Sequence, residues 1–153
     1  MIDTPQIVET EEVTAAVLRM TVPRSEIKLV MGNGMKELVQ TVGDQAVVMS
    51  GAVFTHHFKM EPDRFDFEIG VPVRSMVKPM GRVRPGSLPA ARVARTVYHG
   101  GYEGLGAAWG EFEAWIKAEG LTAAPDLWEV YVSGPESSPD PSRWRTELNR
   151  PLV

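Results

Sequence analysis

Glu129 is the residue of this sequence whose type fits least well with its neighbours. It lies within Leu-Trp-Glu-Val-Tyr-Val, residues 127–132, which is otherwise apolar. Successive side chains of a strand point to opposite faces, so Glu129 would share a face with Leu127 and Tyr131. A strand that is apolar on both faces is usually buried on both faces. The pattern therefore predicts a carboxylate held away from bulk water.

A buried carboxylate needs compensation for the loss of water. It binds a cation or hydrogen-bond donors, or its pKa rises until the group is neutral. Such a group can anchor a cationic or hydrogen-bond-donating ligand, and it can also transfer protons. The alternative is an ion pair with a structural arginine, such as Arg95 or Arg145, and periodicity alone does not decide between these possibilities.

Aromatic residues occur on several segments that could surround Glu129. Rings around a carboxylate suit flat or positively charged organic molecules, through stacking and cation–π attraction. Taken singly, an aromatic residue is more often part of the core than a ligand contact. The predicted ligand-binding residues are Glu129, Tyr131, Trp109, Tyr98, Phe54, Tyr102, His56, Phe67 and Trp144.

Other kinds of chemistry find little support in the sequence. His56 and His57 are adjacent on a predicted strand, so their side chains point to opposite faces and cannot share a metal ion. There is no cysteine, which excludes disulfides, thiolate metal sites and a cysteine nucleophile. No nucleophile elbow, Walker-type loop or GxGxxG pattern is present. We therefore predict no metal and no cofactor.

Length and charge indicate the general class of protein. The 153 residues suit one domain covering residues 1–153, and the net charge of −4 disfavours direct nucleic-acid binding. The N-terminal segment lacks the basic and apolar regions of a signal peptide, and no apolar run reaches membrane-spanning length. We expect a cytoplasmic protein without membrane contact.

The predicted elements occur twice in the same order, strand-helix-strand-strand. The first repeat covers about residues 13–73, and its helix is predicted at 27–42 from the spacing of apolar residues. The second covers about 91–153, with a helix that begins near Leu105 and ends at Gly120. The strands are predicted at 16–22, 46–58, 64–73, 91–99, 127–133 and 143–148.

Residues of about 74–90 join the two repeats. They are rich in proline, glycine and basic residues, and no acidic residue occurs between Ile69 and Tyr102. We interpret this segment as a solvated connector, with an anion-binding surface as the alternative.

One helix and three strands cannot cover the apolar surface of a single repeat. The two repeats should therefore pack together as one α+β body with an antiparallel sheet. A ligand groove is expected where they meet, because such junctions seldom close without a concavity.

Four blocks resemble the GyrI-like family, the effector-binding domain of transcription activators. Residues 91–121 resemble its second strand-to-helix entry, including Gly100, Gly101 and Tyr102. The blocks DLWEVYVSGP, WRTELNRPL and FDFEIGVPV resemble its glutamate-bearing strand, its closing strand and the end of its first repeat. The resemblance implies two pseudo-symmetric SHS2-type repeats and a groove in which Glu129 meets hydrophobic, often cationic, compounds.

The resemblance implies several roles. The first is binding or sequestration of toxic hydrophobic compounds, or effector sensing. The second is hydrolysis of reactive cyclopropane-bearing compounds, with Glu129 and Tyr131 as catalytic residues. The third is inhibition of a protein partner of the gyrase type. Only about a dozen residues precede the first predicted strand, too few for the helix-turn-helix module of many relatives, so we expect no DNA-binding module here.

Overall fold

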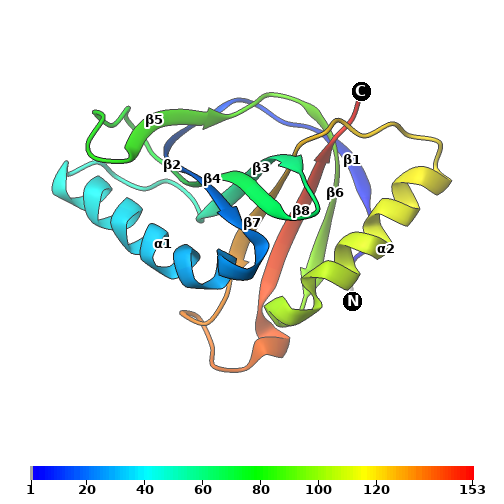
Figure 1. Cartoon of the computed structure of the whole chain (residues 1–153). Coiled ribbons are helices and arrows are strands. Elements are labelled where there is room, and N and C mark those ends of the chain that lie inside the picture. The colour runs from blue at the N-terminus through cyan, green and yellow to red at the C-terminus, as the bar shows by residue number, and fades with distance from the viewer. Residues whose placement is uncertain (1) are drawn as a thin grey trace.

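The computed structural model describes residues 2–153. The fold is α+β, as predicted, with two α-helices and one eight-stranded antiparallel sheet in the order β1-β6-β8-β7-β3-β4-β2-β5 (Figure 1). The helices are α1 (Ile27–Asp44) and α2 (Leu105–Ala118). The strands are β1 (Gln6–Glu9), β2 (Val13–Pro23), β3 (Phe54–Met60), β4 (Arg64–Pro72), β5 (Val83–Leu88), β6 (Arg92–His99), β7 (Leu127–Ser133) and β8 (Arg145–Pro151).

Two equivalent halves meet in the middle of the sheet. The first half is β2-α1-β3-β4, in which β4 pairs with both β2 and β3. The second half is β6-α2-β7-β8, in which β8 pairs with both β6 and β7. Strands β3 and β7 pair with each other, and this register places Thr55 opposite Glu129. We call the β3–β7 pair the seam.

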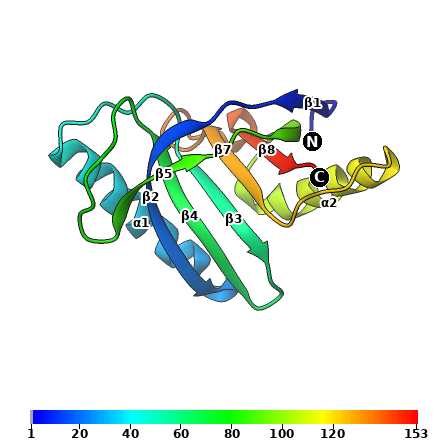
Figure 2. The same ribbon diagram turned by 90° about the horizontal axis from the view of Figure 1, so that it is seen from above.

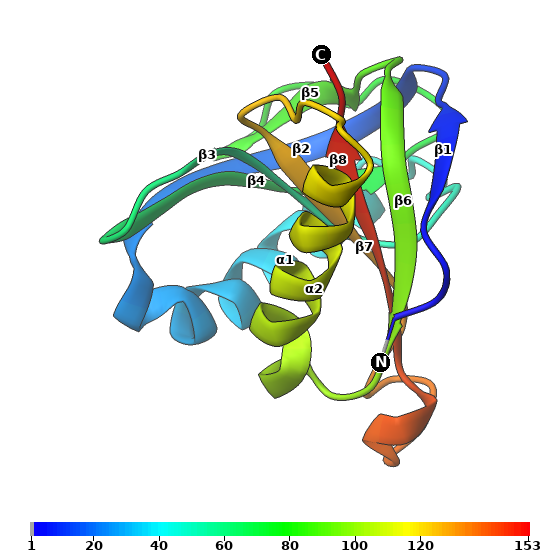
Figure 3. The same ribbon diagram turned by 90° about the vertical axis from the view of Figure 1, so that its right-hand side faces the viewer.

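Both helices lie on the same side of the curved sheet, one against each half (Figures 1 and 3). On α1, Leu38 and Val42 are buried against the first half, and on α2, Phe112 and Ile116 are buried against the second. A third cluster, which includes Phe54 and Trp128, occupies the opposite face of the sheet. Neither helix combines the length and the apolar composition needed to cross a bilayer, as far as residues 2–153 show.

The segment predicted as a solvated connector contains strand β5, which corrects that expectation. Val83 and Leu88 are buried, and β5 pairs with β2 along the edge of the sheet. An edge strand tolerates proline because its outer N–H groups need no partner. Gly86 lies so close to β2 that a Cβ atom there would fall 2.7 Å from the Val17 side chain. Proline and glycine are therefore part of an edge strand here, rather than of a loop.

The other differences concern the ends of elements. Strand β3 begins at Phe54, so much of the segment predicted at 46–58 is not strand. Strand β1 was not expected; it pairs with β6 and extends the second half. Strand β1 and the C-terminal strand β8 therefore lie on either side of β6 (Figure 2).

Candidate functional site

A pocket of about 940 Å³ lies over the seam and between the two helices. Its floor comes from Thr55 and His57 of β3 and from Leu127, Glu129 and Tyr131 of β7. Its walls come from α1 and α2, from the short 3-10 turn that precedes each helix, and from single residues of β4 and β8. These residues are Arg24, Ile27, Lys28, Met31, Met35, Phe65, Tyr102, Glu103, Leu105, Gly106, Trp109, Gly110, Glu113 and Arg150.

Glu129 is buried in this floor, with 9% of its surface exposed. The indole N–H of Trp109 donates to its Oε2 atom over 2.6 Å, and the phenol of Tyr131 donates to its Oε1 atom over 2.8 Å. The Thr55 hydroxyl lies 2.8 Å from the Tyr131 oxygen. Because the single Tyr131 proton is directed at Glu129, Thr55 is the donor in that pair. A chain of donors from Thr55 through Tyr131 thus ends on one carboxylate oxygen.

Two opposing effects act on the protonation of Glu129. Burial raises the pKa of this carboxyl, while the hydrogen bonds from Trp109 and Tyr131 lower it. Burial is the larger effect, because each neutral donor replaces only part of the lost hydration. Burial and the nearby charge of Glu129 raise the pKa of Tyr131 well above its usual range, which keeps the phenol protonated.

The alternative considered from the sequence was an ion pair between Glu129 and an arginine such as Arg95 or Arg145. No such pair is found within residues 2–153. Arg95 instead bonds to Asn149 and pairs with Glu147, and Arg145 donates to the carbonyl of Arg143. The hydrogen bonds that Glu129 accepts from the described residues therefore come from neutral donors.

The helices contribute walls of different character. On α1, Ile27, Met31 and Met35 are spaced at one helical turn and face the pocket, while residues further along the helix enter the core. Methionine side chains are flexible and adapt to ligands of different shape. On α2, Gly106 and Gly110 also border the pocket, and a Cβ atom added at either position would meet nothing within 4 Å. These glycines leave room beside Trp109.

Four of the nine predicted ligand-binding residues line the pocket: Glu129, Tyr131, Trp109 and Tyr102. Tyr102, which is 38% exposed, lies edge-on to Tyr131, with ring centroids 5.9 Å apart. Trp144 is outside the lining but supports it, because its ring lies 5.1 Å from that of Tyr102. Whether these residues contact a ligand stays a prediction.

The remaining four predicted residues lie elsewhere. Phe54 and His56 point to the opposite face of the sheet, where Phe54 packs over Gly70 and His56 bonds to Asp126 over 2.8 Å. Phe67 is buried in the core of the first half. Tyr98 is buried under α2 and donates to the carbonyl of Gly101. None of them is among the residues found to line the pocket.

Sequence reasoning missed His57 and Thr55, the floor residues of β3. Their alternation with Phe54 and His56 was visible, but which face turns toward Glu129 depends on the register between β3 and β7. His57 stacks on Phe67, with ring centroids 5.1 Å apart, and its Nδ1 atom is buried without a hydrogen-bond partner in the described structure. Burial lowers the pKa of His57 to about 4, so the ring is neutral at pH 7.

Solved structures with a similar fold include two of EcmrR. The chain superimposes on the EcmrR C-terminal domain with a TM-score of 0.82 at 22% identity, covering 98% of this chain and 97% of that one. For EcmrR in its complex with DNA, the TM-score is also 0.82 at 22% identity, with 97% of this chain covered. The match spans only 57% of that longer EcmrR chain.

Two further solved structures are similar at lower identity. SAV2435 bound to tetraphenylphosphonium has a TM-score of 0.73 at 12% identity, over 99% of this chain and 94% of that one. A hydrolase encoded by lin2189 from Listeria innocua has a TM-score of 0.71 at 12% identity, over 97% and 91%. At these identities, the likenesses show the shared fold. No curated protein sequence matches the chain significantly.

The family itself is shown by the sequence. Residues 3–152 match the family described as the GyrI-like small molecule binding domain. The chain therefore belongs to the GyrI-like family, as the four sequence blocks predicted.

Proposed function

We propose that this protein binds hydrophobic organic cations in the pocket over the seam, with Glu129 as the anionic anchor. The observation that carries the proposal is a buried carboxylate whose described partners are neutral hydrogen-bond donors rather than a basic residue. A ligand cation can supply the positive partner that no residue within 2–153 provides to Glu129. Sequestration of toxic compounds and sensing of an effector are both consistent with such binding.

The walls of the pocket suit a bulky apolar cation. Trp109 and Tyr131 place ring surfaces next to Glu129, so a cation near the carboxylate also gains cation–π attraction. Met31 and Met35 can adapt to different apolar shapes, and a pocket of about 940 Å³ accepts a ligand of drug size. Tetraphenylphosphonium, which is bound in the SAV2435 structure, is a suitable probe.

The experiment is a titration of tetraphenylphosphonium by calorimetry against wild type and Glu129→Gln. Glutamine keeps the shape of the side chain and removes its charge, so we expect affinity to fall at least about tenfold, the usual weight of a charge-assisted contact. The matched control is Glu111→Gln, which changes an exposed residue of the same charge on α2, outside the pocket lining. Equal affinities of wild type and Glu129→Gln would contradict the proposal.

Hydrolysis of a reactive compound is a second candidate, and the contact between Tyr131 and Glu129 favours it. A carboxylate with a raised pKa is a stronger base, and a protonated phenol beside it can donate to a developing oxyanion. Incubation with a cyclopropane-bearing alkylator, followed by mass spectrometry, distinguishes the two functions. Many turnovers per protein molecule support hydrolysis, whereas a plateau at one equivalent supports binding alone.

A further inference from the structure

The pocket has a second charged end, which the cation-binding proposal does not use. Arg24 and Lys28 border it at the entry to α1, on the opposite side from α2 and its Trp109. Neither residue takes part in an ion pair found within residues 2–153. Both are exposed basic side chains.

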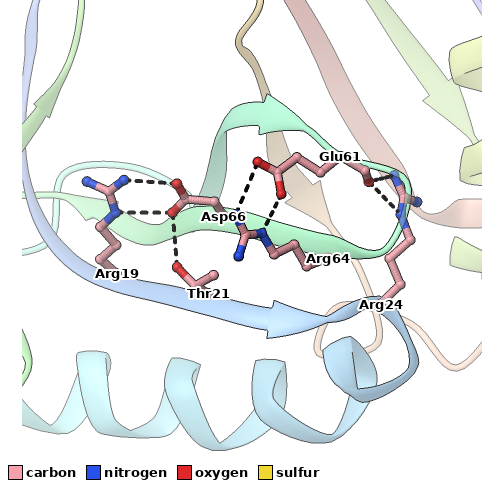
Figure 4. A network of polar contacts seen from close by, with 6 residues as sticks. All are labelled: Arg19, Thr21, Arg24, Glu61, Arg64 and Asp66. Atoms are coloured by element: carbon pink, nitrogen blue, oxygen red, sulfur yellow. Dashed lines mark hydrogen bonds and ion pairs between the residues drawn. The ribbon is translucent and has the colours of Figure 1, made fainter.

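The Arg24 guanidinium is held in place. Its Nε and Nη2 atoms donate to the backbone carbonyl of Glu61 over 3.0 and 2.9 Å, at the turn between β3 and β4 (Figure 4). Its central carbon lies 4.4 Å from the centroid of the Phe65 ring, which also lines the pocket. The carboxylate of Glu61 is occupied by Arg64, as Figure 4 shows, so the turn fixes Arg24 without neutralising it.

The other charged residues of the pocket lie on the side of α2 and β7. Arg150 is the third cation of the lining, but it pairs with Glu113 over 2.8 Å. The remaining acids, Glu103 and Glu129, belong to the α2 and β7 side. After pairing, the remaining charges of the lining are acids in the floor and on the α2 side and cations at the entry to α1, and most other lining residues are apolar or aromatic.

We propose that the preferred ligands are zwitterionic amphiphiles, in which an apolar body separates a cationic group from an anionic one. The cationic group lies at Glu129 and the anionic group, a carboxylate or sulfonate, lies at Arg24 and Lys28. The inference rests on the proposed cation site and adds a requirement at the far end of the ligand. A simple lipophilic cation leaves Arg24 and Lys28 unused and is weakly repelled by them.

Two probes that differ only at one end test this arrangement: dodecyltrimethylammonium and the dodecanoate that carries a trimethylammonium group on its last carbon. Both are titrated below their critical micelle concentrations. We expect the zwitterion to bind wild type about three- to fivefold more tightly, as for a partly solvated ion pair. In the Arg24→Gln/Lys28→Gln variant this preference disappears, so that the ratio of the two affinities falls to about one.

Lys36→Gln is the matched control, because Lys36 is exposed on α1 outside the pocket lining. The preference for the zwitterion should persist in this variant. Equal affinity of wild type for both probes, or a parallel loss of both in Arg24→Gln/Lys28→Gln, overturns the zwitterion proposal. Failure of the cation site is distinguishable, because then neither probe binds, or Glu129→Gln leaves the affinity for the simple cation unchanged.

Discussion

Trp109 of α2 donates its indole N–H to Glu129 of β7 over 2.6 Å. The contact links the helix that borders the pocket to the buried charge in its floor. A ligand cation that approaches Glu129 must share the carboxylate with Trp109 or displace it. The position of α2 and the state of Glu129 are therefore coupled through one hydrogen bond.

Replacing Trp109 by phenylalanine should remove this donor and keep a ring in the pocket wall. We expect a loss of about 1.5–3 kcal/mol in the free energy of unfolding, the usual range for a hydrogen bond to a charged group. The loss is measured by urea denaturation near pH 7. Trp115→Phe is the control, because Trp115 lies on the same helix and packs against the core of the second half. A loss of the same size in the control would mean that ring size, not the bond, sets the effect.

Glu129→Gln should stabilise the free protein near neutral pH. Burial raises the pKa of Glu129 in the folded state. Such a carboxyl contributes stability below its unfolded pKa of about 4.3, and this contribution is lost as pH rises through the folded value. Glutamine has no such loss. The amide oxygen of glutamine can accept from Trp109, and its amide N–H can donate to the Tyr131 oxygen. The Tyr131 hydroxyl then donates to Thr55, so each of these groups keeps a hydrogen-bond partner.

The measurement is the urea midpoint of wild type and Glu129→Gln between pH 4 and pH 8. We expect the variant to be more stable at the upper end, with the difference shrinking toward the lower end. A wild type that is more stable at pH 8 would show that the charged carboxylate is well compensated in the free protein.

Position 110 should separate stability from binding. Gly110 lies within α2 and borders open space, so alanine there should add about 0.5–1 kcal/mol of stability through helix propensity. Phenylalanine at the same position fills the pocket beside Trp109 and should weaken tetraphenylphosphonium binding by more than about tenfold, a steric exclusion of the kind that overpacking produces. Gly32→Phe is the control, because Gly32 also faces open space in a helix but is not among the lining residues. Equal binding by wild type and Gly110→Phe would place the ligand elsewhere.

Much of the fold followed from local patterns, whereas the site followed only in part. The spacing of apolar residues predicted α1 and α2, and the alternation in β7 placed Glu129 and Tyr131 on one face, as the structure has them. Those patterns depend on side chains within one element. The face of β3 that meets Glu129 depends on pairing with a strand about seventy residues away.

The aromatic residues illustrate the same limit. Phe54 and Phe67 each fill a core, and no local signal separates a ring that fills a core from one that borders a pocket. The glycine and proline residues of β5 led to the prediction of a loop. An edge strand tolerates the same residues, so composition alone does not distinguish the two. The seam, the pocket and the edge are properties of the assembled sheet.

His57 should make the free protein less stable as pH falls from about 6.5 to about 4. Its pKa in the folded state is about 4, because burial disfavours the charged ring, while an exposed histidine has a pKa of about 6.5. Between these values the unfolded chain binds a proton and the folded protein does not, so the free energy of unfolding falls by up to about 3 kcal/mol.

Urea denaturation of wild type and His57→Phe at several pH values isolates this contribution. The variant should lose stability less steeply over this interval than wild type does. Parallel pH profiles for wild type and His57→Phe would mean that the buried ring accepts a proton in the folded state as readily as in water.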